Sequence, residues 1–226
     1  MSVESGSRTG VLAVPSWPVS RSRRRPFLGA MVAAVLWAGQ SHAQGTDVRQ
    51  PINDLYASLR GVMAMGTKAT FQQRFDRLAP VIDRVFDLDT ILRTSVGLRW
   101  QSLPDAARQT LSTVFRTFTI ASYAANFDSD GGEKFEVLPQ VRASGADQIV
   151  QSRLIASNGE PIRIDYLMRS SPASWRAVDV LLDGSISRVA VQRSDFRALL
   201  ASGDATPLID SLKRKVADLS GGTMRP

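Results

Sequence analysis

The sequence predicts an α+β fold in which helices come first and an antiparallel sheet follows. Apolar residues recur at helical spacing as far as residue 127, and at every second position from residue 134 onward. Three turn signals, Ser144-Gly145, Asn158-Gly159 and Asp183-Gly184, divide the second half into short segments, a spacing that favours antiparallel pairing. We therefore expect a sheet of about four to five strands, packed under several mostly N-terminal helices.

Apolar stripes predict the first two helices. Pro51 suits a first helical turn. The stripe that follows consists of Ile52, Leu55, Tyr56, Leu59, Val62 and Met63. Residues 66–70 interrupt the pattern, and a second stripe runs from Phe71 to Phe86. Because Pro80 lies within this second stripe, we expect a kink or a helix boundary there.

Capping residues predict a short third helix. Asp87 and Asp89 supply N-terminal caps, and Gly97 closes the segment. The last helical stretch is expected over residues 195–201 and 207–219, where apolar side chains return to helical spacing.

The longest predicted helix lies between these segments. Residues 105–127 contain neither Pro nor Gly. Ser102 or Leu103 is expected to cap this helix, with Pro104 in its first turn. One face carries Leu111, Val114, Phe115, Phe118 and Ser122.

The clearest strand covers residues 161–169. Ile162, Ile164, Tyr166 and Met168 alternate there with Arg163, Asp165, Leu167 and Arg169. This alternation predicts one apolar face and one mostly solvated face. Neighbouring strands are expected at residues 134–142, 148–156, 174–182 and 186–192.

The first 43 residues are typical of a cleavable export signal. Five arginines and a single acid precede an uncharged apolar run of 13 residues, 27–39, and Ser41-His42-Ala43 offers a cleavage site near Ala43. A helix that crosses a bilayer needs about 20 residues, so a retained anchor is disfavoured. Arg24-Arg25-Pro26 also resembles a twin-arginine signal, and both export routes stay open. Residues 44–226 then form one domain.

The composition of residues 44–226 excludes several kinds of site. The chain has no cysteine, and its one histidine, His42, precedes the expected cleavage point. Disulfides, thiol nucleophiles, serine–histidine triads and the usual zinc sites are therefore excluded. Removal of the signal leaves 23 basic against 20 acidic residues, a net charge of about +3. This low charge argues against a nucleic-acid partner, and no motif calls for a cofactor or a metal.

Several local patterns occur in an order that is typical of one family. They are Phe86-Asp87-Leu88-Asp89, Gly97, Trp100, Ser102, Phe115, Phe118, Tyr123, Trp175-Arg176-Ala177-Val178-Asp179-Val180, Gly184-Ser185-Ile186-Ser187 and Arg193-Ser194-Asp195-Phe196. Through these residues the chain resembles the MlaC/toluene-tolerance family over about residues 54–200. Val178 and Val191-Gln192 depart from the family pattern and resemble the hopanoid-associated branch, sometimes called HpnM.

The resemblance implies a periplasmic lipid carrier that is not an enzyme. Such a carrier holds phospholipid or hopanoid tails in an apolar pocket and moves lipid between membrane-bound transport complexes of the inner and outer membranes. The candidate pocket residues are Val114, Phe115 and Phe118 on the longest helix, and Ile162, Ile164, Tyr166, Val178 and Val180 on the sheet. An apolar pocket would bind tails without any cofactor.

Two alternatives stay open. An enzyme on an α+β domain could use Asp165 or Asp179 with Tyr166 on a hydrophobic substrate, since carboxylates can act as general acids or bases. An adaptor could dock on membrane-bound partners and carry no lipid.

Overall fold

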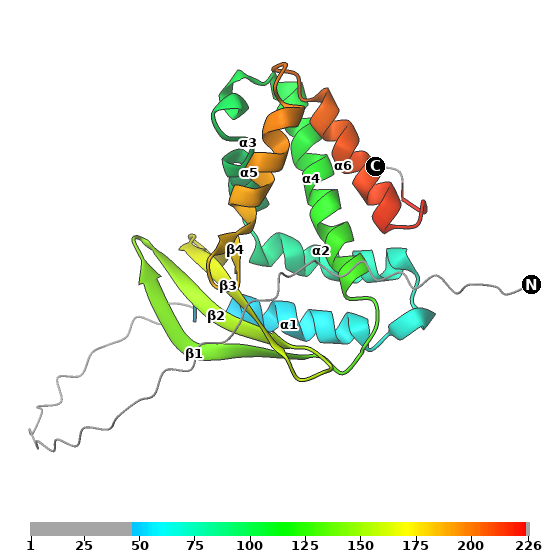
Figure 1. Cartoon of the computed structure of the whole chain (residues 1–226), viewed down its shortest axis with the longest axis vertical. Coiled ribbons are helices and arrows are strands. Elements are labelled where there is room, and N and C mark those ends of the chain that lie inside the picture. The colour runs from blue at the N-terminus through cyan, green and yellow to red at the C-terminus, as the bar shows by residue number, and fades with distance from the viewer. Residues whose placement is uncertain (1–46, 225–226) are drawn as a thin grey trace, which may run out of the picture. The chain divides into compact units, whose positions relative to one another are not determined.

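The computed structural model describes residues 47–224, which belong to one compact unit, Ala43–Pro226. The expected export signal lies outside the described residues. Helices and an antiparallel sheet make up the described part, so the predicted α+β class is confirmed (Figure 1). The helices are α1 (Gln50–Met63), η1 (Gly66–Lys68), α2 (Phe71–Val85), α3 (Leu88–Val96), η2 (Gly97–Ser102), α4 (Asp105–Asn126), α5 (Arg188–Leu199) and α6 (Thr206–Leu219). The strands are β1 (Lys134–Ser144), β2 (Asp147–Ile155), β3 (Pro161–Ser170), β4 (Trp175–Leu182) and β5 (Ile186–Ser187).

Helix α2 begins with a capping box and continues through a proline. The Thr70 hydroxyl accepts a bond from the Gln73 backbone N–H at 3.2 Å, and the Gln73 side chain accepts one from the Thr70 N–H at 2.8 Å. The helix boundary expected at Pro80 is wrong, because α2 is continuous from Phe71 to Val85. Pro80 is exposed, so the backbone carbonyl that loses its helical donor lies on the side that water can reach.

The expected caps are confirmed for α3 and corrected for α4. Asp87 caps α3 by accepting the Thr90 N–H at 3.0 Å, and Gly97 ends it with a φ of 70° that favours glycine. Helix α4 has Pro104 at its N-cap and no side-chain cap. Ser102 does not cap α4, because it ends η2, where its hydroxyl donates to the Arg99 carbonyl at 2.8 Å.

The sheet is an antiparallel meander with the strand order β1-β2-β3-β4-β5. Four of the expected strands are confirmed. The fifth is corrected, because β5 contains only Ile186 and Ser187 and the chain then enters α5. Ser187 caps that helix by accepting the Ala190 N–H at 2.9 Å. A short alternating pattern does not distinguish a strand from the first turns of an exposed helix. Here the cap at Ser187 favours the helix.

Strand β4 contacts the ends of two helices. Arg176 donates to the carbonyl of Phe86 at 2.8 Å and to that of Asp83, both at the C-terminal end of α2. Asp179 accepts the N–H of Val189 at 3.1 Å and the hydroxyl of Ser187 at the N-terminal end of α5. A cation therefore lies at a helix C-terminus and an anion at a helix N-terminus, the arrangement that the helix dipoles favour.

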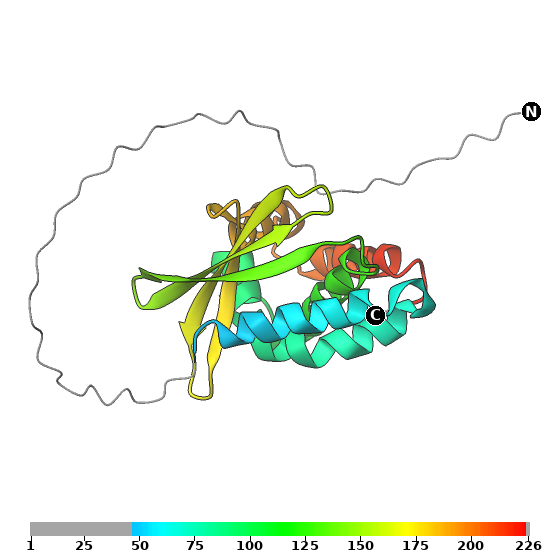
Figure 2. The ribbon, with the colours of Figure 1, turned by 90° about the horizontal axis from the view of Figure 1, so that it is seen from below.

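The helices pack in pairs around a shared apolar core. Helix α1 packs on α2, α4 on α6, and α3 on α5, and the views from the two sides agree (Figures 1 and 2). Helix α1 also contacts β1, and α2 contacts β4. Leu111, Phe115 and Ile120 of α4 are among the most deeply buried side chains of this core. The sheet is thus held mainly at its β4 edge and along α1.

Replacing Asp179 with alanine tests the contact between β4 and α5. We expect Asp179→Ala to lower the free energy of unfolding by about 2 kcal/mol, because several donors at the start of α5 lose a charged acceptor. Urea unfolding followed by circular dichroism measures the change. Asp195→Ala, at an exposed position of the same helix, is the matched control and should change stability by less than about 0.5 kcal/mol. Equal effects of the two substitutions would contradict this role.

Candidate functional site

One face of the sheet is apolar and only partly covered. The strand register places on this face Phe135, Val137, Val141, Val150, Leu154, Ile162, Ile164, Tyr166 and Val180. At its centre Val150 and Tyr166 are buried. Towards its edges Val137, Ile164 and Val180 are only half-buried, and Val141 is 38% exposed. The apolar face therefore extends beyond the helices that pack on it, and it offers a surface for an apolar ligand.

A closed ring of aromatic side chains lies between this face and the helices. Each member contacts the next, with ring centroids 4.8 to 6.4 Å apart. In order around the ring the members are Tyr56, Tyr166, Phe86, Tyr123, Phe127 and Phe135. They come from α1, β3, the end of α2, the C-terminal part of α4 and β1. Such contacts add to the stabilisation that burial of the rings provides.

The hydroxyl groups within this interior form one directed chain of hydrogen bonds. Tyr166 donates to the Tyr56 oxygen at 3.2 Å, and the Tyr56 and Ser152 oxygens are 2.6 Å apart. Ser152 donates its single hydroxyl hydrogen to the Ile164 carbonyl, so Tyr56 is the donor to Ser152. Each of the three hydroxyls thus has an acceptor, and the network is compatible with an apolar interior.

Burial keeps the tyrosines of this interior neutral. It raises the pKa of Tyr56 above its ordinary value of 10.0. It also raises the pKa of Tyr123 and that of Tyr166 well above the same value. An apolar environment disfavours the phenolate, so these side chains stay neutral to a higher pH than solvated tyrosines do.

The candidate pocket residues fall into two groups. Ile162, Ile164, Tyr166 and Val180 lie on the same face of the sheet, and Val178 is buried where the register between β3 and β4 shifts. Their assignment as pocket residues stays a prediction.

The three candidates on α4 contact other helices. The Phe115 ring lies edge-on to the ring of Phe196 in α5, at 6.4 Å, and the Lys215 ammonium of α6 lies 5.8 Å from the Phe118 ring. Val114 is buried beside the α4–α6 cleft described below. The part of α4 that meets the aromatic ring is its C-terminal end, where Tyr123 and Phe127 lie.

Sequence reasoning did not assign five of the six members of the aromatic ring to the site. Tyr56 belonged to a recognised helical stripe, and Phe86 and Tyr123 lie in the family pattern, but none of these signals shows which side chains meet. Phe127 and Phe135 lie at the end of the predicted helix 105–127 and at the start of the predicted strand 134–142, and neither pattern shows that the two rings meet across the turn. Only the fold brings these residues together.

The acidic side chains considered for catalysis have structural partners. Asp165 is fully buried, and its oxygens accept bonds from Arg163 Nε at 3.0 Å and Nη2 at 2.6 Å. The same contact raises the pKa of Arg163. Asp165 and Asp179 also lie on the sheet face opposite to Tyr166, because neighbours along a strand point to opposite sides. The geometry therefore does not join either acid with Tyr166 in one site.

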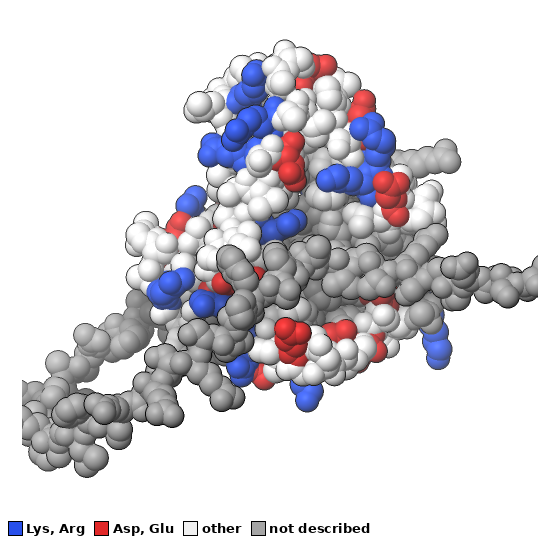
Figure 3. Space-filling view, viewed as in Figure 1, with Lys and Arg blue, Asp and Glu red and all other residues white. Residues whose placement is uncertain are grey.

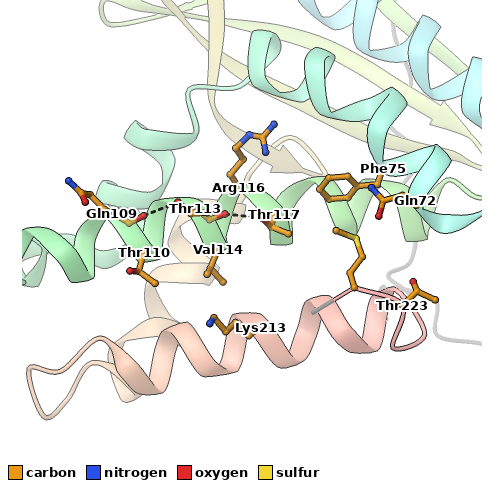
Figure 4. A pocket seen from close by; sticks show the side chains of 11 residues that line it. Gln72, Phe75, Gln109, Thr110, Thr113, Val114, Arg116, Thr117, Lys213 and Thr223 are labelled. Carbon is orange, nitrogen blue, oxygen red and sulfur yellow. Dashed lines mark hydrogen bonds between the residues drawn. The ribbon is translucent and has the colours of Figure 1, made fainter. Parts of the chain in front are cut away.

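A separate open cleft of about 720 Å³ lies between α2, α4 and α6 (Figure 4). Its lining is mixed, with Gln72, Phe75, Gln109, Thr110, Thr113, Val114, Arg116, Thr117, Lys213, Thr223 and Met224. Thr113 and Thr117 donate to carbonyls of their own helix, at 3.1 and 3.0 Å. The many polar groups make this cleft less suited to an apolar ligand than the sheet face.

Two kinds of feature are absent from residues 47–224. No helix there combines the length and the apolar character that crossing a bilayer requires. No group of three or more metal-ligating side chains comes together in the same part of the chain.

The fold and this interior define a class of α+β proteins in which an antiparallel sheet and a layer of helices share an apolar space. Within that class, the chain belongs to the MlaC protein family, whose pattern matches residues 57–214. A solved structure with the same fold is that of a phospholipid-binding protein from Ralstonia solanacearum in complex with a phospholipid. The TM-score is 0.65 at 22% sequence identity, and the match covers 76% of this chain and 96% of that one. No curated protein matches the sequence significantly.

The three tyrosines of the protein provide a spectroscopic test of this interior. Because their pKa values are all raised in the folded state, we expect less tyrosinate absorbance at pH 10 from the folded protein than from the unfolded chain. The unfolded chain releases these protons near pH 10, so stability is unaffected at lower pH and falls as the pH rises through that value. Absorbance and circular dichroism, recorded together against pH, should change in one step. A native protein that titrates near pH 10 would contradict the buried network.

Proposed function

We propose that this protein is a periplasmic lipid carrier that holds lipid tails between the sheet and the helices. The observation that carries the proposal is the apolar sheet face, which extends beyond its helical cover and borders the aromatic ring. Membership of the MlaC family and the likeness to a phospholipid-bound structure support it. The lipid headgroup would stay outside this apolar space, where water solvates its charge.

The energetics suit a carrier without a cofactor or a catalytic step. Burial of an acyl chain contributes about 0.8 kcal/mol per methylene group, so a chain of ordinary length needs no polar contact in order to bind. The neutral tyrosines add apolar surface and no charge. Binding would require the helices and the sheet to separate locally, and the half-buried edge of the sheet is the region that few contacts restrain.

The wider role is part of the same proposal. Residues 1–43 would direct export and be removed near Ala43, and residues 44–226 would be the carrier domain. Lipid would pass between membrane-bound transport complexes of the inner and outer membranes. The ligand would be a phospholipid or, if the chain belongs to the hopanoid-associated branch, a polycyclic hopanoid. The arginine and backbone partners of Asp165 and Asp179 support a binding protein over the enzyme alternative.

Native mass spectrometry of the protein purified after export tests the carrier proposal. We expect a mass increment of one lipid, which solvent extraction then identifies as a phospholipid or a hopanoid. A protein that arrives empty and also fails to take lipid from vesicles would refute the proposal and favour an adaptor that carries nothing.

A polar substitution on the apolar sheet face tests the location of the tails. We expect Ile164→Gln to reduce the bound lipid at least about tenfold, because the tails would have to desolvate an amide. Arg153→Gln is the matched control, since Arg153 is an exposed residue of the adjacent strand and its side chain points to the opposite face. Lipid bound per protein is quantified after extraction. Equal lipid content in the two variants would place the tails elsewhere.

A further inference from the structure

A single leucine protrudes from the end of the molecule that α3 and α5 form. Leu98 is 96% exposed, the most exposed large apolar side chain among residues 47–224. It follows Gly97, whose positive φ of 70° turns the chain out of α3 and into η2. This exposure is costly in water, because the whole side chain lacks apolar contacts. A single exposed leucine is ordinary on a protein surface, so the residues around Leu98 determine whether it marks a binding surface.

Three arginines surround this leucine. Arg99, Arg193 and Arg197 line a hollow of about 500 Å³ together with Val96, Gly97, Leu98 and Leu200. Arg193 and Arg197 are one helical turn apart on α5 and therefore share a face. Within residues 47–224 none of the three forms an ion pair, and no acidic side chain lines the hollow. Lys and Arg side chains gather over α3 and α5 in Figure 3.

The hollow depends on a glycine. A Cβ atom at position 97 would lie 2.9 Å from Arg193 Nη2 and 3.0 Å from its Nε, so the guanidinium rests directly on the Gly97 backbone. Arg93, which is also exposed, lies over the Trp100 ring with its Cζ 5.9 Å from the ring centroid. Arg193 is thus positioned by packing, and as it forms no ion pair with residues 47–224, its donor groups are available to a ligand outside the protein.

These features fit the surface of an anionic lipid bilayer. Guanidinium groups bind phosphate oxygens in pairs, and a leucine among cations can enter the boundary between headgroups and acyl chains. A free phosphate would occupy the arginines but leave Leu98 in water. An acidic protein would satisfy the charge, but the hollow offers only Val96, Leu98 and Leu200 as apolar contacts for a helix of such a partner.

We propose that Leu98, Arg99, Arg193 and Arg197 form a docking surface for anionic phospholipid headgroups at a bilayer. This surface lies on η2 and α5, beside α3 and away from α1 and β1 (Figure 1). It therefore holds the protein at a membrane without covering the apolar sheet face. Docking and tail binding are separate events on separate parts of the fold.

Co-sedimentation with vesicles tests this surface on the protein purified after export. We expect binding to phosphatidylcholine–phosphatidylglycerol vesicles, weaker binding as salt increases, and none to pure phosphatidylcholine. The double variant Arg193→Gln/Arg197→Gln should weaken binding by about tenfold or more. Leu98→Ser, which keeps the charge and alters a fully exposed residue, should weaken it by about threefold or more.

Matched controls separate the docking surface from general charge. Arg60→Gln/Arg84→Gln removes two exposed cations from α1 and α2, and it should change binding by less than about twofold. An equal loss in this variant would overturn the proposal, as would unchanged binding of Leu98→Ser. Displacement by inorganic phosphate at unchanged ionic strength would assign the arginines to a free anion and overturn it. Absence of vesicle binding would overturn it and favour an acidic protein partner.

The result of the vesicle-binding experiment does not depend on whether the protein carries lipid. Lipid content, measured by extraction as above, should be the same in the wild-type protein and in the docking variants. An empty protein that still docks would refute the carrier and keep the docking surface.

Discussion

The contact of β4 with two helix ends determines how the sheet and the helices are arranged. Arg176 binds carbonyls where α2 ends, and three positions further along the same strand Asp179 binds donors where α5 begins. Opposite charges on one strand thus satisfy opposite helix termini, and each would be costly to bury without its partner. Both residues belong to the family pattern, and the role that the structure shows for them is to join the sheet to the helices. Because β4 is anchored in this way, the strands beyond it are placed by their register and by their contacts with α1.

The anchoring of one edge leaves the other edge of the sheet free of such restraint. Beyond β3 the sheet is covered mainly by α1, and the apolar residues of β1 and β2 that extend past this helix remain partly in water. A folded protein usually buries such a face more completely. Here the incompletely covered part of the face borders the ring of aromatic side chains, so a large apolar surface adjoins a part of the sheet that the helices restrain little.

Local patterns in the sequence predicted most of the elements but few of the contacts. Periodicity located α1, α4 and four strands, because each has a long apolar stripe or a clear alternation. It did not separate β5 from α5, where seven residues are too few to define a period. The pocket that the family resemblance implied brings Phe115 and Phe118 towards the sheet, and in the structure these two rings contact α5 and α6. The side of a helix that meets a given neighbour depends on how all the helices pack, and no single stripe contains that information.

The hydroxyl chain from Tyr166 through Tyr56 to Ser152 has a polarity. Its hydrogens all point towards the Ile164 carbonyl, so the first oxygen, that of Tyr166, donates onward and accepts nothing from residues 47–224. A polar group of a guest molecule that reaches this oxygen meets lone pairs and no available hydrogen. A guest alcohol that reached this oxygen would find an acceptor for its hydrogen, whereas an ester or ketone oxygen would find no donor.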